Sequence, residues 1–146
     1  MGGYSAIGLV YPKNNVNVAA TLRAAHCYGS SLVVVQGKRY KRHGADTNKS
    51  YRKIPLIHTY DLFETIPFDC IPVSVDIVPG ATPLHEFKHP ERALYIFGPE
   101  DGTLGRQHIE KSKHVIFVQT NFCMNLAATV NVVLYDRAVK RGFPNT

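Results

Sequence analysis

The chain has 146 residues, of which 45% are hydrophobic and 19% charged, and 17 Lys and Arg against 11 Asp and Glu give a formal charge of +6. This length fits a single domain over residues 1–146, which can bury roughly two-thirds of its unfolded surface without disulfides or metals. No apolar run in the sequence approaches the ~18–20 residues that a membrane span requires. The first residues lack a secretory pattern, and the three cysteines form no CxxC pair. We therefore expect a soluble, cytoplasmic protein.

Strand and helix patterns alternate along the sequence. Apolar and β-branched runs predict strands over residues 4–11, 31–36, 54–58, 70–78 (starting after Pro72), 93–97 and 114–118. Helices are predicted over residues 16–28, 60–65, 106–111 and 124–141. Asn14 or Asn15 can cap the first helix and Gly29 can end it, while Gly142 and Pro144 follow the last helix. This alternation predicts an α/β fold, a mostly parallel sheet with helices on both faces.

The positive charge is concentrated in one segment. Residues 38–53 hold seven of the 17 Lys and Arg residues, with Tyr40 and Tyr51 between them. Cations release counterions from a phosphate backbone and tyrosines stack on bases, so the segment is a candidate RNA-binding loop, with a solvated loop as the alternative. The candidate RNA-binding residues are Lys38, Arg39, Lys41, Arg42, Arg52 and Lys53.

His85, Glu86 and His89 form an HExxH pattern, which on a helix can bind zinc and activate a water molecule. Pro83 and Pro90 flank the pattern and leave too little room for a stable helix. We therefore interpret it as a polar surface turn, keep a zinc hydrolase only as a remote alternative, and expect no metal.

Three polar segments follow predicted strands, where open α/β sheets bind their ligands. Asn17 and Arg23 lie on the first predicted helix. The second segment, residues 98–105, is rich in glycine and contains Glu100. The third, residues 120–127, contains Cys123 and Asn125 before the last helix. Cys123 has no histidine placed to activate it, which favours a pocket wall over a catalytic thiol.

Taken together and in this order, the three segments resemble the motifs of SpoU/TrmH-type SPOUT RNA methyltransferases. The first motif, an Asn-containing helix start that leads to Arg, matches residues 17–25. The second, a strand running into Gly-x-Glu-x-x-Gly, matches residues 93–102, and the third matches residues 115–136. Gln119 stands where the family usually has Pro, and Cys123 stands where it usually has Ser.

The resemblance implies a SPOUT-like domain with a C-terminal trefoil knot, a rare exception to unknotted chains. It implies S-adenosylmethionine as cofactor, bound at Gly98, Val118, Cys123 and Met124, with residues 75–77 as a wall. Arg23 is the implied central catalytic residue. Asn17, Glu100 and Asn125 are implied to hold Arg23 and the loops in place.

The implied reaction is methyl transfer to a ribose 2′-hydroxyl of tRNA or rRNA by a homodimer with the last helix in its interface. Apolar residues of that helix could then face a partner or their own core: Leu126, Val130, Val133 and Leu134. The Gln119 and Cys123 departures leave open a non-catalytic RNA-binding relative with the same fold.

Overall fold

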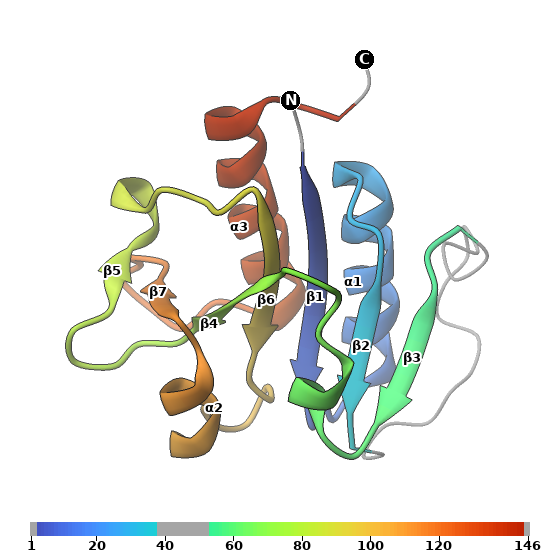
Figure 1. Cartoon of the computed structure of the whole chain (residues 1–146). Helices are drawn as coiled ribbons and strands as arrows, with labels where there is room; N and C mark the ends of the chain where they lie inside the picture. Colours follow the sequence, from blue (N-terminus) through green and yellow to red (C-terminus); the bar gives the residue numbers. More distant parts are fainter. Residues whose placement is uncertain (1–2, 38–52, 145–146) are drawn as a thin grey trace.

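A computed structural model describes residues 3–37 and 53–144, and within them seven parallel strands form one sheet in the order β3-β2-β1-β6-β4-β7-β5 (Figure 1). The predicted mostly parallel α/β fold is thereby confirmed. The elements in chain order are β1 (Tyr4–Val10), α1 (Asn15–Tyr28), β2 (Val33–Gln36), β3 (Leu56–Thr59), the 3₁₀ helix η2 (Leu62–Thr65), β4 (Ile71–Val75), β5 (Thr82–Pro83), the 3₁₀ helix η3 (Leu84–Glu86), β6 (Arg92–Phe97), α2 (Arg106–Lys111), β7 (His114–Phe117) and α3 (Leu126–Arg141).

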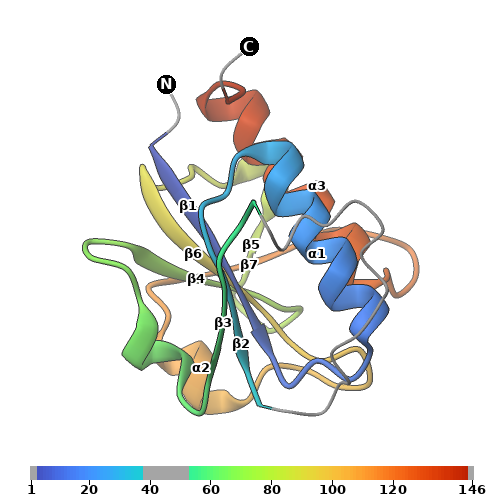
Figure 2. The same cartoon turned by 90° about the vertical axis from the view of Figure 1, so that its right-hand side faces the viewer.

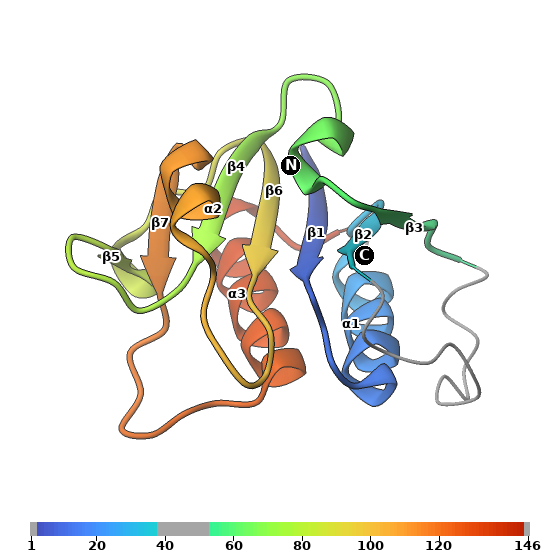
Figure 3. The same cartoon turned by 90° about the horizontal axis from the view of Figure 1, so that it is seen from below.

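The sheet separates two apolar layers. Helices α1 and α3 lie side by side against one face, while α2 and η2 cover the other (Figures 2 and 3). Under α1 and α3 the core includes Leu9, Tyr95 and Ile116, all fully buried. Leu126, Val130, Val133 and Leu134 of α3 are also buried in this core, so they pack within their own chain.

Local signals in the sequence explain the ends of the two long helices. The Asn14 side chain accepts a hydrogen bond from the Val16 N–H at 2.9 Å, and Gly29 ends α1 with a φ of 72°. This left-handed conformation suits glycine, which has no Cβ to clash. Helix α3 begins at Leu126, later than predicted, because Asn125 is its cap and accepts from the Ala128 N–H at 3.1 Å.

Two strand predictions need correction. Strand β4 begins at Ile71 and includes Pro72, although the sequence predicted a start after this proline. The Pro72 carbonyl accepts from the Lys113 N–H directly before β7 begins, and β7 pairs with β4 only from Val73 onward. The N–H that Pro72 lacks would face this side, so its absence removes no hydrogen bond of the β4–β7 pairing. Strand β5, only two residues long, is not predicted by any apolar run.

Chain order and sheet order together place the loops that matter for function. Strands β4, β6 and β7 are neighbours although they are far apart in sequence, so the segments after them meet at one edge of the sheet. None of the helices within the described residues is both long and apolar enough to cross a membrane.

Candidate active site

A pocket of about 750 Å³ lies at the carboxyl ends of β4, β6 and β7. Its walls come from residues 75–77, 97–100, 102–104, 117–118 and 120–126, together with Asn17 of α1 and Thr129 of α3. The size is that of pockets for drug-sized and cofactor-sized ligands, which occupy roughly 300–1,000 Å³. Parts of all three polar segments singled out in the sequence therefore border one cavity.

Glu100 connects the second segment to the first. Its carboxylate accepts hydrogen bonds from the backbone N–H groups of Lys13 at 2.8 Å and Asn14 at 3.2 Å, and from the Asn17 side-chain amide at 2.9 Å. Burial alone would raise the pKa of Glu100, but these N–H donors lower the pKa below its ordinary value. Glu100 is therefore an ionised anchor that holds the start of α1 against the loop after β6.

Asn125 extends this connection to the third segment. Its side-chain NH₂ donates to the side-chain oxygen Oδ1 of Asn17 at 3.1 Å, while its own side-chain Oδ1 caps α3. Asn17 thus donates to Glu100 and accepts from Asn125, so both ends of its amide are engaged. The three residues predicted to hold the loops in place lie together at the border of the pocket.

The predicted cofactor positions line the same pocket. Gly98, Val118, Cys123 and Met124 are all among its wall residues. A Cβ added at Gly98 would lie 2.9 Å from the Leu104 backbone nitrogen, so glycine is what allows the loop after β6 to fold this tightly. Residues 118–125 lie in neither a helix nor a strand, so their backbone N–H and C=O groups are not used in the hydrogen bonds of regular secondary structure.

The structure places Arg23 away from these residues. Arg23 is exposed on α1 and is not among the residues of this chain that line the pocket. It is seven residues after Val16, so two helical turns put both side chains on one exposed face of α1. Of the predicted RNA-binding residues, Lys53 is exposed before β3, while Lys38, Arg39, Lys41, Arg42 and Arg52 lie outside the described residues.

The HExxH pattern is part of a different cluster. Residues 84–86 form the short helix η3, in which His85 is exposed, whereas His89 is only 3% exposed. In the described part of the chain, no three His, Cys, Asp or Glu side chains could hold a metal ion. His85 and Glu86 fit the predicted surface turn, but His89 corrects that prediction because it is a core residue.

Hydrogen bonds determine the protonation of His89. The Tyr95 hydroxyl accepts from Arg137 at 2.9 Å and lies 2.7 Å from His89 Nδ1; in a neutral imidazole whose one N–H faces the Asp136 carboxylate, Nδ1 accepts from this hydroxyl. The His89 Nε2–H then donates to Asp136 Oδ2 at 2.7 Å, and the imidazole is neutral. Burial lowers the pKa of His89 below 6.5 and outweighs the Asp136 carboxylate, which acts in the opposite direction.

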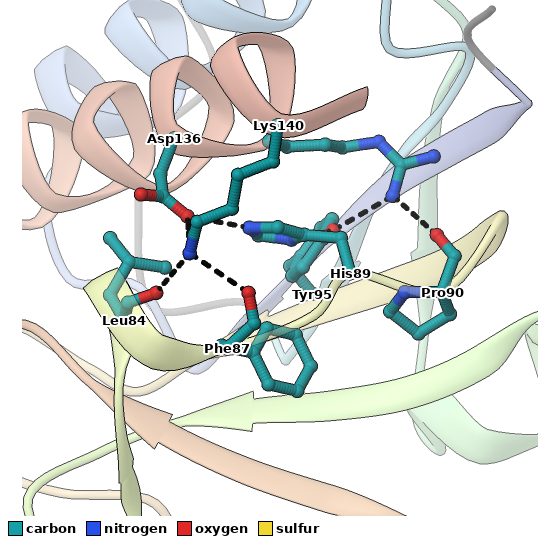
Figure 4. Close-up of polar contacts among 8 residues, drawn as sticks. Leu84, Phe87, His89, Pro90, Tyr95, Asp136 and Lys140 are labelled. Carbon is teal, nitrogen blue, oxygen red and sulfur yellow. Dashed lines mark hydrogen bonds and ion pairs between the residues drawn. The ribbon is translucent and has the colours of Figure 1, made fainter. Parts of the chain in front are cut away.

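Two cations of α3 complete this cluster, which we call the helix latch: His89, Tyr95, Asp136, Arg137 and Lys140. Arg137 donates to the carbonyls of Pro90 at 2.7 Å and Glu91 at 2.8 Å. Lys140 contacts Asp136 and donates to the carbonyls of Leu84 and Phe87 (Figure 4). The latch fastens α3 to the segment that precedes β6; His89, Tyr95 and Arg137 are buried in it, while Asp136 and Lys140 remain partly exposed.

Comparison with solved structures shows which fold the chain has. The chain has a TM-score of 0.83 and 15% identity to the SpoU methyltransferase AviRb from Streptomyces viridochromogenes in complex with the cofactor AdoMet, covering 97% of this chain and 62% of that one. The TrmH/SpoU tRNA modifying enzyme of A. aeolicus gives a TM-score of 0.82 at 16% identity, covering 94% and 75%. A structure concerning the 2-OH methylation of C/U34 on tRNA gives 0.81 at 16% identity, covering 96% and 92%. The fold is that of the SPOUT methyltransferases, although this chain spans less than two-thirds of AviRb.

The family follows from the sequence. The profile of the SpoU rRNA Methylase family matches residues 5–135, and the chain belongs to this family. Members of the family use S-adenosylmethionine as cofactor. A comparison with curated proteins finds no match.

Proposed function

We propose that the chain is an S-adenosylmethionine-dependent RNA methyltransferase that modifies a ribose 2′-hydroxyl of tRNA or rRNA and works as a homodimer. The observation that carries the proposal is the chain of hydrogen bonds from Glu100 through Asn17 to Asn125, which joins all three family motifs beside one pocket. The relative whose structure concerns 2-OH methylation of C/U34 on tRNA supports a ribose hydroxyl of tRNA as the acceptor.

The pocket fits the cofactor in size and charge. Its described lining includes the carboxylates of Asp76 and Glu100 and no Lys, Arg or His side chain, which favours a cationic ligand over a phosphate-bearing one. Gly98, Val118, Cys123 and Met124 would hold the cofactor largely through backbone groups, so replacing the usual Ser by Cys123 is compatible with binding. When bound, S-adenosylmethionine supplies a methyl group made electrophilic by its sulfonium.

The protein then has to orient the ribose hydroxyl and manage its proton. A guanidinium keeps its charge because its pKa exceeds ~12, so Arg23 is a poor general base. Arg23 would instead bind the phosphate next to the target ribose and stabilise negative charge developing on the oxygen. Glu100, Asn17 and Asn125 would keep the helix that carries Arg23 in register with the pocket loops.

A second subunit accounts for the position of Arg23. The exposed face of α1 carries Val16 beside Arg23, and α3 exposes Val132, Tyr135 and Val139 at helical spacing on its own outer face. Exposed apolar residues on adjacent helices favour contact with a second copy. In that arrangement Arg23 of one subunit would serve the pocket of the other, and the basic segment of residues 38–53 would contact the RNA.

Subunit mixing tests this proposal. Arg23→Ala, and Gly98→Ala at a low concentration of S-adenosylmethionine, are each expected to lose most methyl transfer from S-adenosylmethionine to RNA. If Arg23 acts on the partner's pocket, unfolding and refolding an equal mixture restores one intact site per heterodimer, or about a quarter of wild-type activity for a symmetric dimer. Refolded single variants are the control, and mass spectrometry of the digested RNA should identify a 2′-O-methylnucleoside.

Each result bears on a different part of the proposal. Activity that does not return on mixing would assign Arg23 to its own chain or remove it from the reaction. A methylated base in place of a methylated ribose would overturn the acceptor. Wild-type protein that binds RNA but not S-adenosylmethionine would favour the non-catalytic relative.

A further inference from the structure

Asp76 is a pocket carboxylate that the family motifs do not include. It follows the carboxyl end of β4 and lines the pocket between Val75 and Ile77. Asp76 Oδ1 accepts from the Ile77 backbone N–H at 2.8 Å, and Oδ2 accepts from the Leu104 N–H at 3.1 Å. Both carboxylate oxygens are therefore held by backbone N–H groups, Oδ1 by its neighbour Ile77 and Oδ2 by Leu104 of the loop after β6.

This carboxylate retains capacity to bind a ligand. An ionised carboxylate accepts about four hydrogen bonds and donates none. Glu100 uses three of its positions to hold Lys13, Asn14 and Asn17, whereas Asp76 uses two. Among the acidic side chains that line the pocket, Asp76 therefore has more acceptor capacity left, and it needs O–H or N–H donors to fill it.

We infer that Asp76 binds the ribose hydroxyls of the cofactor, an assignment that rests on the proposed use of S-adenosylmethionine at this pocket. A vicinal diol offers two adjacent O–H donors, which match the oxygens of one carboxylate. In other α/β folds an acidic side chain at the end of a parallel strand binds a nucleotide ribose in the same way. The ligand has two other hydrogen-bond donors, the adenine amine and the α-ammonium, and the ligand series below distinguishes both from the ribose hydroxyls.

A thermodynamic cycle distinguishes this role from a purely structural tether between β4 and the loop after β6. Calorimetry would measure the affinity of wild type and Asp76→Asn for S-adenosylhomocysteine and for its 2′-deoxy and 3′-deoxy forms. Methylthioadenosine, which lacks the amino-acid part, reports on the α-ammonium, and an N6-dimethyl analogue reports on the adenine amine. Asp69→Asn, an exposed carboxylate with a φ of 63° that Asn also tolerates, is the charge-matched control.

The assignment predicts that removing a ribose hydroxyl weakens binding to wild type and to Asp69→Asn by about 10- to 100-fold, because hydrogen bonds to charged groups are strong. Asp76→Asn should bind the parent ligand more weakly by a similar factor and should lose most of this sensitivity to the deoxy forms. A ribose penalty that is equal in wild type and Asp76→Asn would overturn the assignment. The assignment would also be overturned if the affinity lost on Asp76→Asn were no longer lost for methylthioadenosine or for the N6-dimethyl analogue. Asp76 would then contact the α-ammonium or the adenine amine instead of the ribose.

Two further results keep this outcome separate from the proposed function. If Asp76→Asn does not fold, the wild-type series alone decides, because full affinity for both deoxy ligands would sink the assignment. Wild type that does not bind S-adenosylhomocysteine at all would overturn the proposed function itself. Normal binding without a ribose penalty would leave that function standing and remove only the role of Asp76.

Discussion

The pocket and the helix latch contain similar chemical groups and differ in what those groups can still bind. In the latch, His89 and Tyr95 are buried and their polar atoms are engaged by Asp136 and Arg137. At the pocket, Asp76 and the loop of residues 118–125 keep acceptor and donor groups at the border of a cavity. A buried, fully bonded cluster stabilises a fold, whereas accessible and partly bonded groups can recognise a ligand. Chemical identity alone therefore does not separate the two.

The largest effect on stability is expected at Arg137. Arg137 is 6% exposed, and its guanidinium donates to the Tyr95 hydroxyl and to carbonyls of three residues, so Arg137→Met removes all of these hydrogen bonds at once. We expect a loss of about 3–5 kcal/mol in the free energy of unfolding, measured by urea denaturation. Arg106→Met, on an exposed surface of α2, is the control and should change little. An Arg137→Met protein as stable as wild type would contradict the structural role of the latch.

The next effect concerns the shape of the pocket. A methyl group at Gly98 would meet the backbone of Thr103 and Leu104, so Gly98→Ala must displace the loop after β6. Overpacking of this kind costs about 1–3 kcal/mol, and we expect affinity for S-adenosylmethionine to fall by about 10- to 100-fold. Gly105→Ala, whose added Cβ lies 3.7 Å from the nearest atom, is the matched control. Equal affinities for the two variants would show that the Gly98 contact does not shape the cofactor site.

The smallest effect is a pH dependence of stability. Burial lowers the pKa of both His89 and His108 below 6.5, so the unfolded chain binds protons that the folded chain does not. Stability is then full above pH 6.5 and falls as the pH drops below it. Urea midpoints at pH 7.5 and 5.5 measure this, and a His89→Gln, His108→Gln variant should show a smaller difference. A stability that rises on acidification would reverse the assignment of neutral histidines.

Much of the pocket could be predicted from the sequence because its residues follow strands. Asn17, Glu100 and Asn125 each belong to a local motif, and parallel strands bring the segments after them to one edge. Helix α2 also has its predicted bounds, residues 106–111. Such features depend on short-range spacing, which a sequence displays directly.

The latch could not be predicted because its residues do not follow the carboxyl ends of strands, where the order of the sheet brings segments together. His89 is next to Lys88 and Pro90, which indicate a surface turn, but its carboxylate partner is 47 residues away in α3. Asp76 is missed as an individual residue because its second donor is Leu104 on another loop. The exposed position of Arg23 likewise depends on which face of α1 packs on the sheet, and the weak amphipathic pattern of a small-residue helix does not define it.

Calorimetric titration of S-adenosylmethionine into wild type, Gly98→Ala and Arg137→Met tests the separation of the two regions most directly. At a temperature where all three proteins are folded, wild type and Arg137→Met are expected to bind with equal affinity, and Gly98→Ala should bind more weakly. Weak binding by folded Arg137→Met together with full binding by Gly98→Ala would place ligand recognition at the latch and contradict the account.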